Sequence, residues 1–164
     1  MSGARLVVFG YGNPSRGDDA IGPLLVERLT ALQAARPDWP AVELLTDFQL
    51  QVEHAVDLQG RELALFIDAH MACAAPFVFS RLEAARDVSY TTHAMTPAAL
   101  LYAYAQVYRQ PPPPAFLLSV RGEHFELGDP LSPAAETHLD AAARLLEKLC
   151  MQPDGPAWQQ YRSR

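Results

Sequence analysis

Three near-continuous apolar runs constrain the fold of this chain more than any other feature of its sequence. They are RLVVF at residues 5–9, LALFI at 63–67 and AFLLSV at 115–120. Runs of this length without polar alternation are typical of strands that are covered on both faces, as in parallel sheets. Two further segments rich in apolar and β-branched residues, VELLT at 42–46 and FVFSRL at 77–82, bring the expected strands to five.

Stretches with helical spacing separate the expected strands. Apolar residues recur there at steps of three and four, which predicts helices over residues 20–35, 97–108 and 133–149 and a shorter one within 47–58. Thr96 and Ser132 each precede a proline, which is the arrangement of an N-cap residue followed by proline at the first helical position.

Strands that alternate with helices predict a single α/β domain over residues 1–150. We expect three layers, with a mainly parallel five-stranded sheet and helices on both of its faces. The remaining residues, 151–164, contain two prolines, a glycine and no periodicity, so they are expected to form a loose C-terminal tail.

Composition and charge narrow the class of protein. The formal net charge of −6 argues against a nucleic-acid partner, which would need a basic face. No apolar run approaches the ~20 residues of a membrane span, and the N-terminus lacks the apolar core of a signal peptide. Cys73 and Cys150 cannot build a disulfide framework. We therefore expect a cytoplasmic protein with reduced thiols, no membrane partner and, by default, a monomeric state.

The segment FGYGNPSRGDDAIG, residues 9–22, carries three glycines directly ahead of Asp18 and Asp19. A dinucleotide fingerprint would need glycine where Ser15 stands, and a P-loop would need lysine where Asp18 stands. Two carboxylates at a helix N-terminus would also repel phosphate, so nucleotide binding is not expected. One acid of the pair could simply cap the helix. The glycines predict unusual dihedrals and room for a bulky group above the loop.

Other candidate functional residues follow or precede expected elements at the same edge of the sheet. Asp68 and His70 follow the apolar run LALFI at 63–67, and His93 precedes an expected helix. Asp19, Asp68 and His93 together would offer oxygen and nitrogen ligands that can hold a divalent first-row metal ion. The plainer alternative is that the acids cap loops and that the histidine lies on the surface or in the core. Spacing alone does not show that the three residues converge.

At these residues the chain resembles the hydrogenase maturation endopeptidases, which process the large subunit of nickel–iron hydrogenases. The family's opening signature is matched by Gly10, Gly12, Asn13, Asp18, Asp19 and Gly22. Asp68 in FIDA, His93 in THAMTP and FELGDPLSP at 125–133 resemble later family segments, so the resemblance runs over residues 6–149. The segment DFQLQVEH, 47–54, is similar to the branch that serves cytosolic NAD-reducing or bidirectional hydrogenases.

The resemblance implies a nickel-dependent processing endopeptidase in which Asp19, Asp68 and His93 bind the metal and carry catalysis. It implies that the nickel is carried by the protein substrate, a hydrogenase large-subunit precursor, and that one cleavage removes the precursor's C-terminal extension. Asp18 would be structural. The sequence contains no serine elbow and no Cys/His motif typical of a dyad, so it is compatible with catalysis without a Ser or Cys nucleophile. The resemblance implies a hydrolase of the aspartic type. Our hypothesis is that the metal polarises the scissile carbonyl or activates water, with Asp18 a weak candidate for the base.

Two other functions remain open on the sequence. One is a general metallopeptidase or amidohydrolase with a resident metal, and the other is a metal-checking chaperone that binds the nickel subunit without cutting it. His70 and His124 are expected to be loop or exposed side chains, and His54 and His138 to lie on the polar faces of helices. Cys73 is expected to be a buried, inert thiol.

Overall fold

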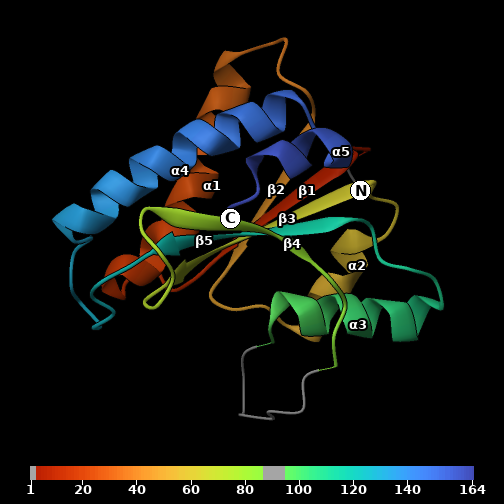
Figure 1. Cartoon of the computed structure of the whole chain (residues 1–164), viewed down its shortest axis with the longest axis horizontal. Coiled ribbons are helices and arrows are strands. Elements are labelled where there is room, and N and C mark those ends of the chain that lie inside the picture. The colour runs from red at the N-terminus through yellow and green to blue at the C-terminus, as the bar shows by residue number, and fades with distance from the viewer. Residues whose placement is uncertain (1–2, 87–94) are drawn as a thin grey trace.

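A five-stranded sheet forms the centre of the computed structural model, which describes residues 3–86 and 95–164 (Figure 1). Its strands are β1 (Leu6–Tyr11), β2 (Val42–Asp47), β3 (Leu63–His70), β4 (Phe77–Leu82) and β5 (Ala115–Arg121). They lie in the order β2-β1-β3-β5-β4. All neighbouring pairs are parallel except β4 and β5, which are antiparallel. The predicted mainly parallel five-stranded sheet is confirmed.

Helices cover both faces of this sheet and complete the three predicted layers (Figure 1). On one face lie α1 (Ile21–Ala35), α4 (Pro133–Met151) and α5 (Gly155–Trp158), followed by the short helix η3 (Gln159–Tyr161). On the other face lie η2 (Val52–His54), α2 (Ala55–Leu58) and α3 (Pro97–Tyr108). A further 3₁₀ turn, η1 (Gly17–Ala20), joins β1 to α1. In the described ranges no helix combines the length and the apolar character needed to cross a membrane.

The alternation of side chains in β1 shows why its sequence is apolar throughout. Leu6 and Val8 belong to the hydrophobic cluster beneath α1 and α4, whereas Val7 and Phe9 belong to the cluster beneath α2 and α3. All four side chains are at most 2% exposed. Both faces of the strand are therefore covered, and neither face admits a polar residue.

Both predicted helix N-caps are confirmed. The Thr96 hydroxyl accepts a hydrogen bond from the N–H of Ala99, and the Ser132 hydroxyl accepts one from the N–H of Ala135. In each case proline occupies the first turn. The predicted helix within 47–58 is shorter than expected, because β2 runs to Asp47 and the helical turns begin only at Val52.

The prediction of a loose C-terminal tail is wrong for α5 and η3, because Trp158 anchors them. Its side chain is 1% exposed and packs against the rings of Phe79 and Phe116, at centroid distances of 6.2 and 5.3 Å. The indole N–H donates to the carbonyl oxygens of Leu149 and Gln152 at 3.1 and 2.8 Å. A large apolar ring with its polar atom satisfied binds this segment to the core.

Candidate active site

Three polar side chains from separate elements meet where β1 and β3 end. Tyr11 is the last residue of β1, Asp68 lies near the end of β3, and Asp19 lies in η1. The Tyr11 hydroxyl donates to Oδ2 of Asp68 at 3.2 Å. The charge of Asp19 influences the pKa of both Tyr11 and Asp68. The fold therefore brings Asp19 close enough to Asp68 for their charges to interact, and Tyr11 of β1 bonds directly to Asp68 of β3.

Asp68 lies within β3, not after it as the sequence indicated, and pairs in register with Ser119 of β5. Its Oδ2 accepts the Tyr11 hydrogen bond, while its Oδ1 is buried and has no hydrogen-bond partner among residues 3–86 and 95–164. Burial raises the pKa of the Asp68 carboxyl, and the charge of Asp19 adds to the rise, whereas the side chain of Ser119 and, to a smaller extent, the Tyr11 hydrogen bond act in the opposite direction. Oδ1 of Asp68 can therefore still accept a hydrogen bond or bind a cation.

Tyr11 is the residue at this site that the sequence analysis missed. Burial raises its pKa well above the usual value, and the charges of Asp68 and Asp19 add to that rise. The phenol therefore stays protonated and remains a hydrogen-bond donor at neutral pH. Its sequence context, an aromatic residue on the same strand face as Phe9, is also that of an ordinary core side chain, so no local signal distinguishes it.

The glycines of the opening signature accommodate protein backbone. A Cβ atom at Gly10 would collide with the carbonyl oxygen of Gly22 in α1, so these two glycines let helix and strand approach closely. Gly12 has a φ of +146°, and a Cβ there would collide with the carbonyl oxygen of Asp19. The predicted room for a bulky group is therefore absent at both positions. The tight turn instead places the N–H of Asn13 2.7 Å from Oδ2 of Asp19.

Asp18 is completely buried and joins η1 to the segment that precedes α4. Its carboxylate accepts hydrogen bonds from the N–H groups of Glu123, His124 and Ser132 at 2.7, 3.0 and 2.8 Å, and from the Ser132 hydroxyl at 2.8 Å. Burial by itself would raise the pKa of Asp18, but these hydrogen bonds outweigh it and lower the pKa. These contacts favour the structural role of Asp18 over the hypothesis that it serves as a base, because both of its oxygens already accept hydrogen bonds.

His93, the third predicted ligand, lies outside the described residues. Among the residues that are described, no three His, Cys, Asp or Glu side chains are grouped so that they could hold a metal ion. Asp19 and Asp68 nevertheless suit a cation, because they offer two neighbouring carboxylates and one buried oxygen that lacks a partner. The assignment of the three ligands stays a prediction.

Two other residues near the end of β3 do not point to a second centre. His70 is exposed, and its Nδ1 accepts a hydrogen bond from the N–H of Ala72 at 3.1 Å. Cys73 is half-buried, with Sγ 3.5 Å from the carbonyl oxygen of Ser119. Burial raises the pKa of this thiol, and the charge of Asp68 raises it further, so the thiol stays protonated and unreactive at neutral pH. His124 is exposed, as expected.

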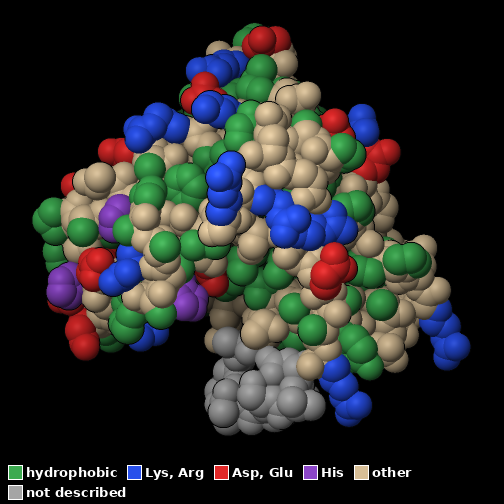
Figure 2. All heavy atoms as spheres, in the orientation of Figure 1, with side chains coloured by type: hydrophobic (Ala, Val, Ile, Leu, Met, Phe, Trp, Pro, Cys, Tyr) green, Lys and Arg blue, Asp and Glu red, His purple; other side chains and the backbone are tan. Residues whose placement is uncertain are grey.

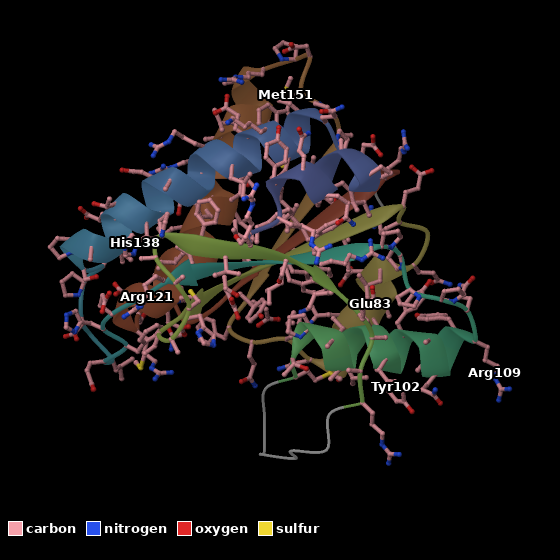
Figure 3. The ribbon with its side chains drawn as sticks, viewed as in Figure 1. Glu83, Tyr102, Arg109, Arg121, His138 and Met151 are labelled. Atoms are coloured by element: carbon pink, nitrogen blue, oxygen red, sulfur yellow. The ribbon has the colours of Figure 1, made fainter. Side chains whose placement is uncertain are left out.

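The two remaining histidines make structural contacts. The side chain of His54 is only 15% exposed; its ring packs edge-on against Phe9, and its Nε2 lies 3.3 Å from Asp47. The predicted placement on a polar helix face is therefore wrong for His54. Nδ1 of His138 lies 3.0 Å from the carbonyl oxygen of Arg121, and Figure 3 shows both residues on the side of the molecule where β5 ends.

On the molecular face drawn in Figure 2, basic and acidic side chains are interspersed. Exposed ion pairs in the described part of the chain include Arg28 with Asp140 in α4 at 2.9 Å and Arg36 with Glu147 at 2.7 Å. Such mixed surface pairs indicate an ordinary solvated surface.

Comparison with solved structures finds matches to the chain, whereas comparison with family models and curated proteins finds none. A [NiFe] hydrogenase maturation protease, HycI from Thermococcus kodakarensis KOD1, has the same fold with a TM-score of 0.69 at 21% identity, over 90% of this chain and 92% of that one.

Two further solved structures share somewhat more sequence. The hydrogenase maturating endopeptidase HybD from E. coli is 25% identical with a TM-score of 0.64, over 88% of this chain and 91% of that chain. The hydrogenase 2 maturation peptidase from Thaumarchaeota archaeon SCGC_AB-539-E09 is 26% identical with a TM-score of 0.62, over 88% and 96% of the two chains. The structural comparisons thus support the family that the sequence motifs indicate, the hydrogenase maturation endopeptidases, and leave its branches undistinguished.

Proposed function

We propose that the chain is an endopeptidase that removes the C-terminal extension of a nickel-loaded hydrogenase large-subunit precursor. The observation that carries this proposal is the buried Oδ1 of Asp68, which lacks a partner in the described part of the chain and lies close enough to Asp19 for the charge of Asp19 to raise the pKa of Asp68. A buried carboxylate oxygen without a partner is costly in a purely structural role, and a cation would offset that cost. The names of the matched structures, which are hydrogenase maturation proteases and endopeptidases, suggest the substrate class.

In this proposal Asp19, Asp68 and His93 are the ligands that meet the nickel ion of the substrate. Asp19 is partly exposed, so an ion that arrives inside another protein can reach the pair from the edge of the sheet. Asp68 is held in β3 by its register with β5, which fixes the position of its backbone. A bound divalent ion supplies Lewis acidity toward a carbonyl or a water molecule. Peptide cleavage would then need no Ser or Cys nucleophile, as in an aspartic-type endopeptidase.

The proposal extends to the setting of the enzyme. We propose a monomer that acts in the cytoplasm, where Cys73 and Cys150 would stay reduced. The branch that serves NAD-reducing or bidirectional hydrogenases is part of the same proposal and is supported only by the resemblance of residues 47–54.

The decisive experiment incubates the purified chain with matched nickel-loaded and nickel-free precursors and follows intact mass. We expect the loaded precursor alone to lose its C-terminal extension. Asp19→Ala, Asp68→Ala and His93→Ala should each fold and fail to process it. His124→Ala and Asp140→Ala are matched controls, because both residues are exposed and lie outside the acid pair. Processing by His93→Ala at the parent rate would show that this ligand assignment is wrong.

The same assay separates the alternatives. Hydrolysis of unrelated substrates by a protein that retains tightly bound metal, and that chelators inhibit, would favour a general metallopeptidase. A stable complex with the loaded precursor and no change in its mass would favour a metal-checking chaperone. Either result would replace the proposed function.

A further inference from the structure

The hydroxyl group of Tyr11 contacts one proposed ligand and lies near another. The Tyr11 ring packs against the hydrophobic cluster beneath α2 and α3, on the strand face that also carries Phe9. From there its hydroxyl donates to Oδ2 of Asp68 at 3.2 Å. This hydrogen bond joins the ends of β1 and β3, which are neighbours in the sheet.

The bond gives the two oxygens of Asp68 different roles. Oδ2 is held by Tyr11, whereas Oδ1 is buried and has no partner within the described ranges of the chain. A carboxylate that is held through one oxygen loses freedom to rotate, so the other oxygen is kept in one position. Asp19 is held in a comparable way, because the N–H of Asn13 donates to its Oδ2 at 2.7 Å.

A phenol is well suited to hold a carboxylate that must also bind a cation. It donates one hydrogen bond and carries no positive charge. Lysine or arginine in the same place would hold the carboxylate equally well but would repel the ion. Phenylalanine would pack equally well but would leave Oδ2 free to turn. The half-buried ring packed against the core and the neutral donor of Tyr11 therefore suit it to hold a carboxylate that binds a cation.

We propose that Tyr11 is a positioning residue that holds Asp68 so that its Oδ1 binds the nickel ion of the substrate. This inference rests on the proposed function, because it takes Asp68 to be a ligand. It assigns Tyr11 no contact with the reacting atoms. The hydroxyl group acts through Asp68, so its removal should affect the binding of the ion more than the fold.

The test compares Tyr11→Phe with Tyr104→Phe in the full chain. Tyr104 is the matched control, because it lies in the same hydrophobic cluster and its hydroxyl also makes one hydrogen bond of 3.2 Å, with Gln110. Calorimetric titration with Ni²⁺ alone should show binding about 10-fold weaker for Tyr11→Phe and unchanged for Tyr104→Phe, with binding lost in Asp68→Asn. Circular dichroism and thermal unfolding check that the variants fold alike.

The outcomes separate this inference from the proposed function. Wild-type affinity in Tyr11→Phe, together with lost binding in Asp68→Asn, would overturn the positioning role and leave the ligand assignment intact. Wild-type affinity in Asp68→Asn would overturn both. If free Ni²⁺ binds to none of the proteins, processing of loaded precursor decides: we expect Tyr11→Phe to lower kcat about 10-fold with KM nearly unchanged, and an unchanged kcat would overturn the inference.

Discussion

Asp18 and Asp68 both lie at the carboxyl edge of the sheet, but the surroundings of their carboxylates are opposite. Asp18 accepts four hydrogen bonds, shared between both oxygens, from Glu123, His124 and Ser132. Asp68 has one oxygen held by Tyr11 and one buried oxygen without a partner in the described residues. Hydrogen bonding lowers the pKa of Asp18 in spite of burial, whereas burial raises the pKa of Asp68.

This contrast distinguishes an acid that joins segments of the fold from an acid that is left available to a ligand. Asp18 works with neighbouring backbone contacts, in which the N–H of Gly17 donates to Asp129 and that of Gly128 to Ser15. The loop that carries Asp19 is thereby joined to the segment before α4. The hydrogen bonds of Asp18 thus help to hold Asp19 in place, as expected for a rigidly supported site.

The largest expected effect comes from neutralising Asp68. Asp68→Asn should slow processing of nickel-loaded precursor by about 1,000-fold or more, because a cation ligand is lost. The free energy of unfolding should not fall, because the variant no longer buries an incompletely bonded charge. Intact-mass kinetics and urea denaturation measure the two effects, with Asp140→Asn as the control. Processing near the wild-type rate, or a large loss of stability, would contradict the contrast with Asp18.

Asp18→Ala, unlike Asp68→Asn, should lower the stability of the fold. It leaves the buried N–H groups of Glu123, His124 and Ser132 without their acceptor, so the free energy of unfolding should fall by about 3 kcal/mol. Urea denaturation, followed by the fluorescence of Trp39 and Trp158, measures the loss. Stability within about 0.5 kcal/mol of the wild type would show that these hydrogen bonds do not hold the loop.

A smaller loss of stability is expected for Ser132→Ala. This change removes the hydroxyl that donates to Asp18 and also caps α4, so it should cost about 2 kcal/mol. Thr96→Ala removes the equivalent cap from α3 without affecting Asp18 and should cost about 1 kcal/mol. Equal losses in the two variants would indicate that the bond between Ser132 and Asp18 contributes nothing beyond the cap.

The smallest expected effect is the pH dependence of the unfolding free energy that Asp18 contributes. The folded-state pKa of Asp18 is lower than its unfolded value, so the stability that Asp18 contributes is complete above the unfolded pKa and is lost as pH falls through the folded pKa. The difference in unfolding free energy between wild type and Asp18→Ala should therefore shrink as pH falls from 6 to 3. A difference that grows in acid would show that the pKa shift has the opposite sign.

Much of the fold could be predicted because local sequence dictates it. Continuous apolar runs such as residues 63–67 suit strands covered on both faces, and Thr96 and Ser132 specify helix starts through hydrogen bonds to residues three positions away. The anchoring of Trp158 could not be predicted in the same way, because the rings of Phe79 and Phe116 that cover it are distant in sequence.

The same distinction between local sequence and tertiary structure applies to the candidate site. The sequence by itself identified Asp19, in the acidic signature, and Asp68, after an apolar run, as candidates. It also argued against a phosphate ligand, because the sign of charge is a property of the residues alone. Only the tertiary structure decided that Asp18 is fully bonded, that Asp68 keeps a buried oxygen free of partners in the described residues, and that Tyr11 holds it. The physical reason is that hydrogen bonding and burial depend on segments up to 114 residues apart, as between Asp18 and Ser132, which a linear pattern does not bring together.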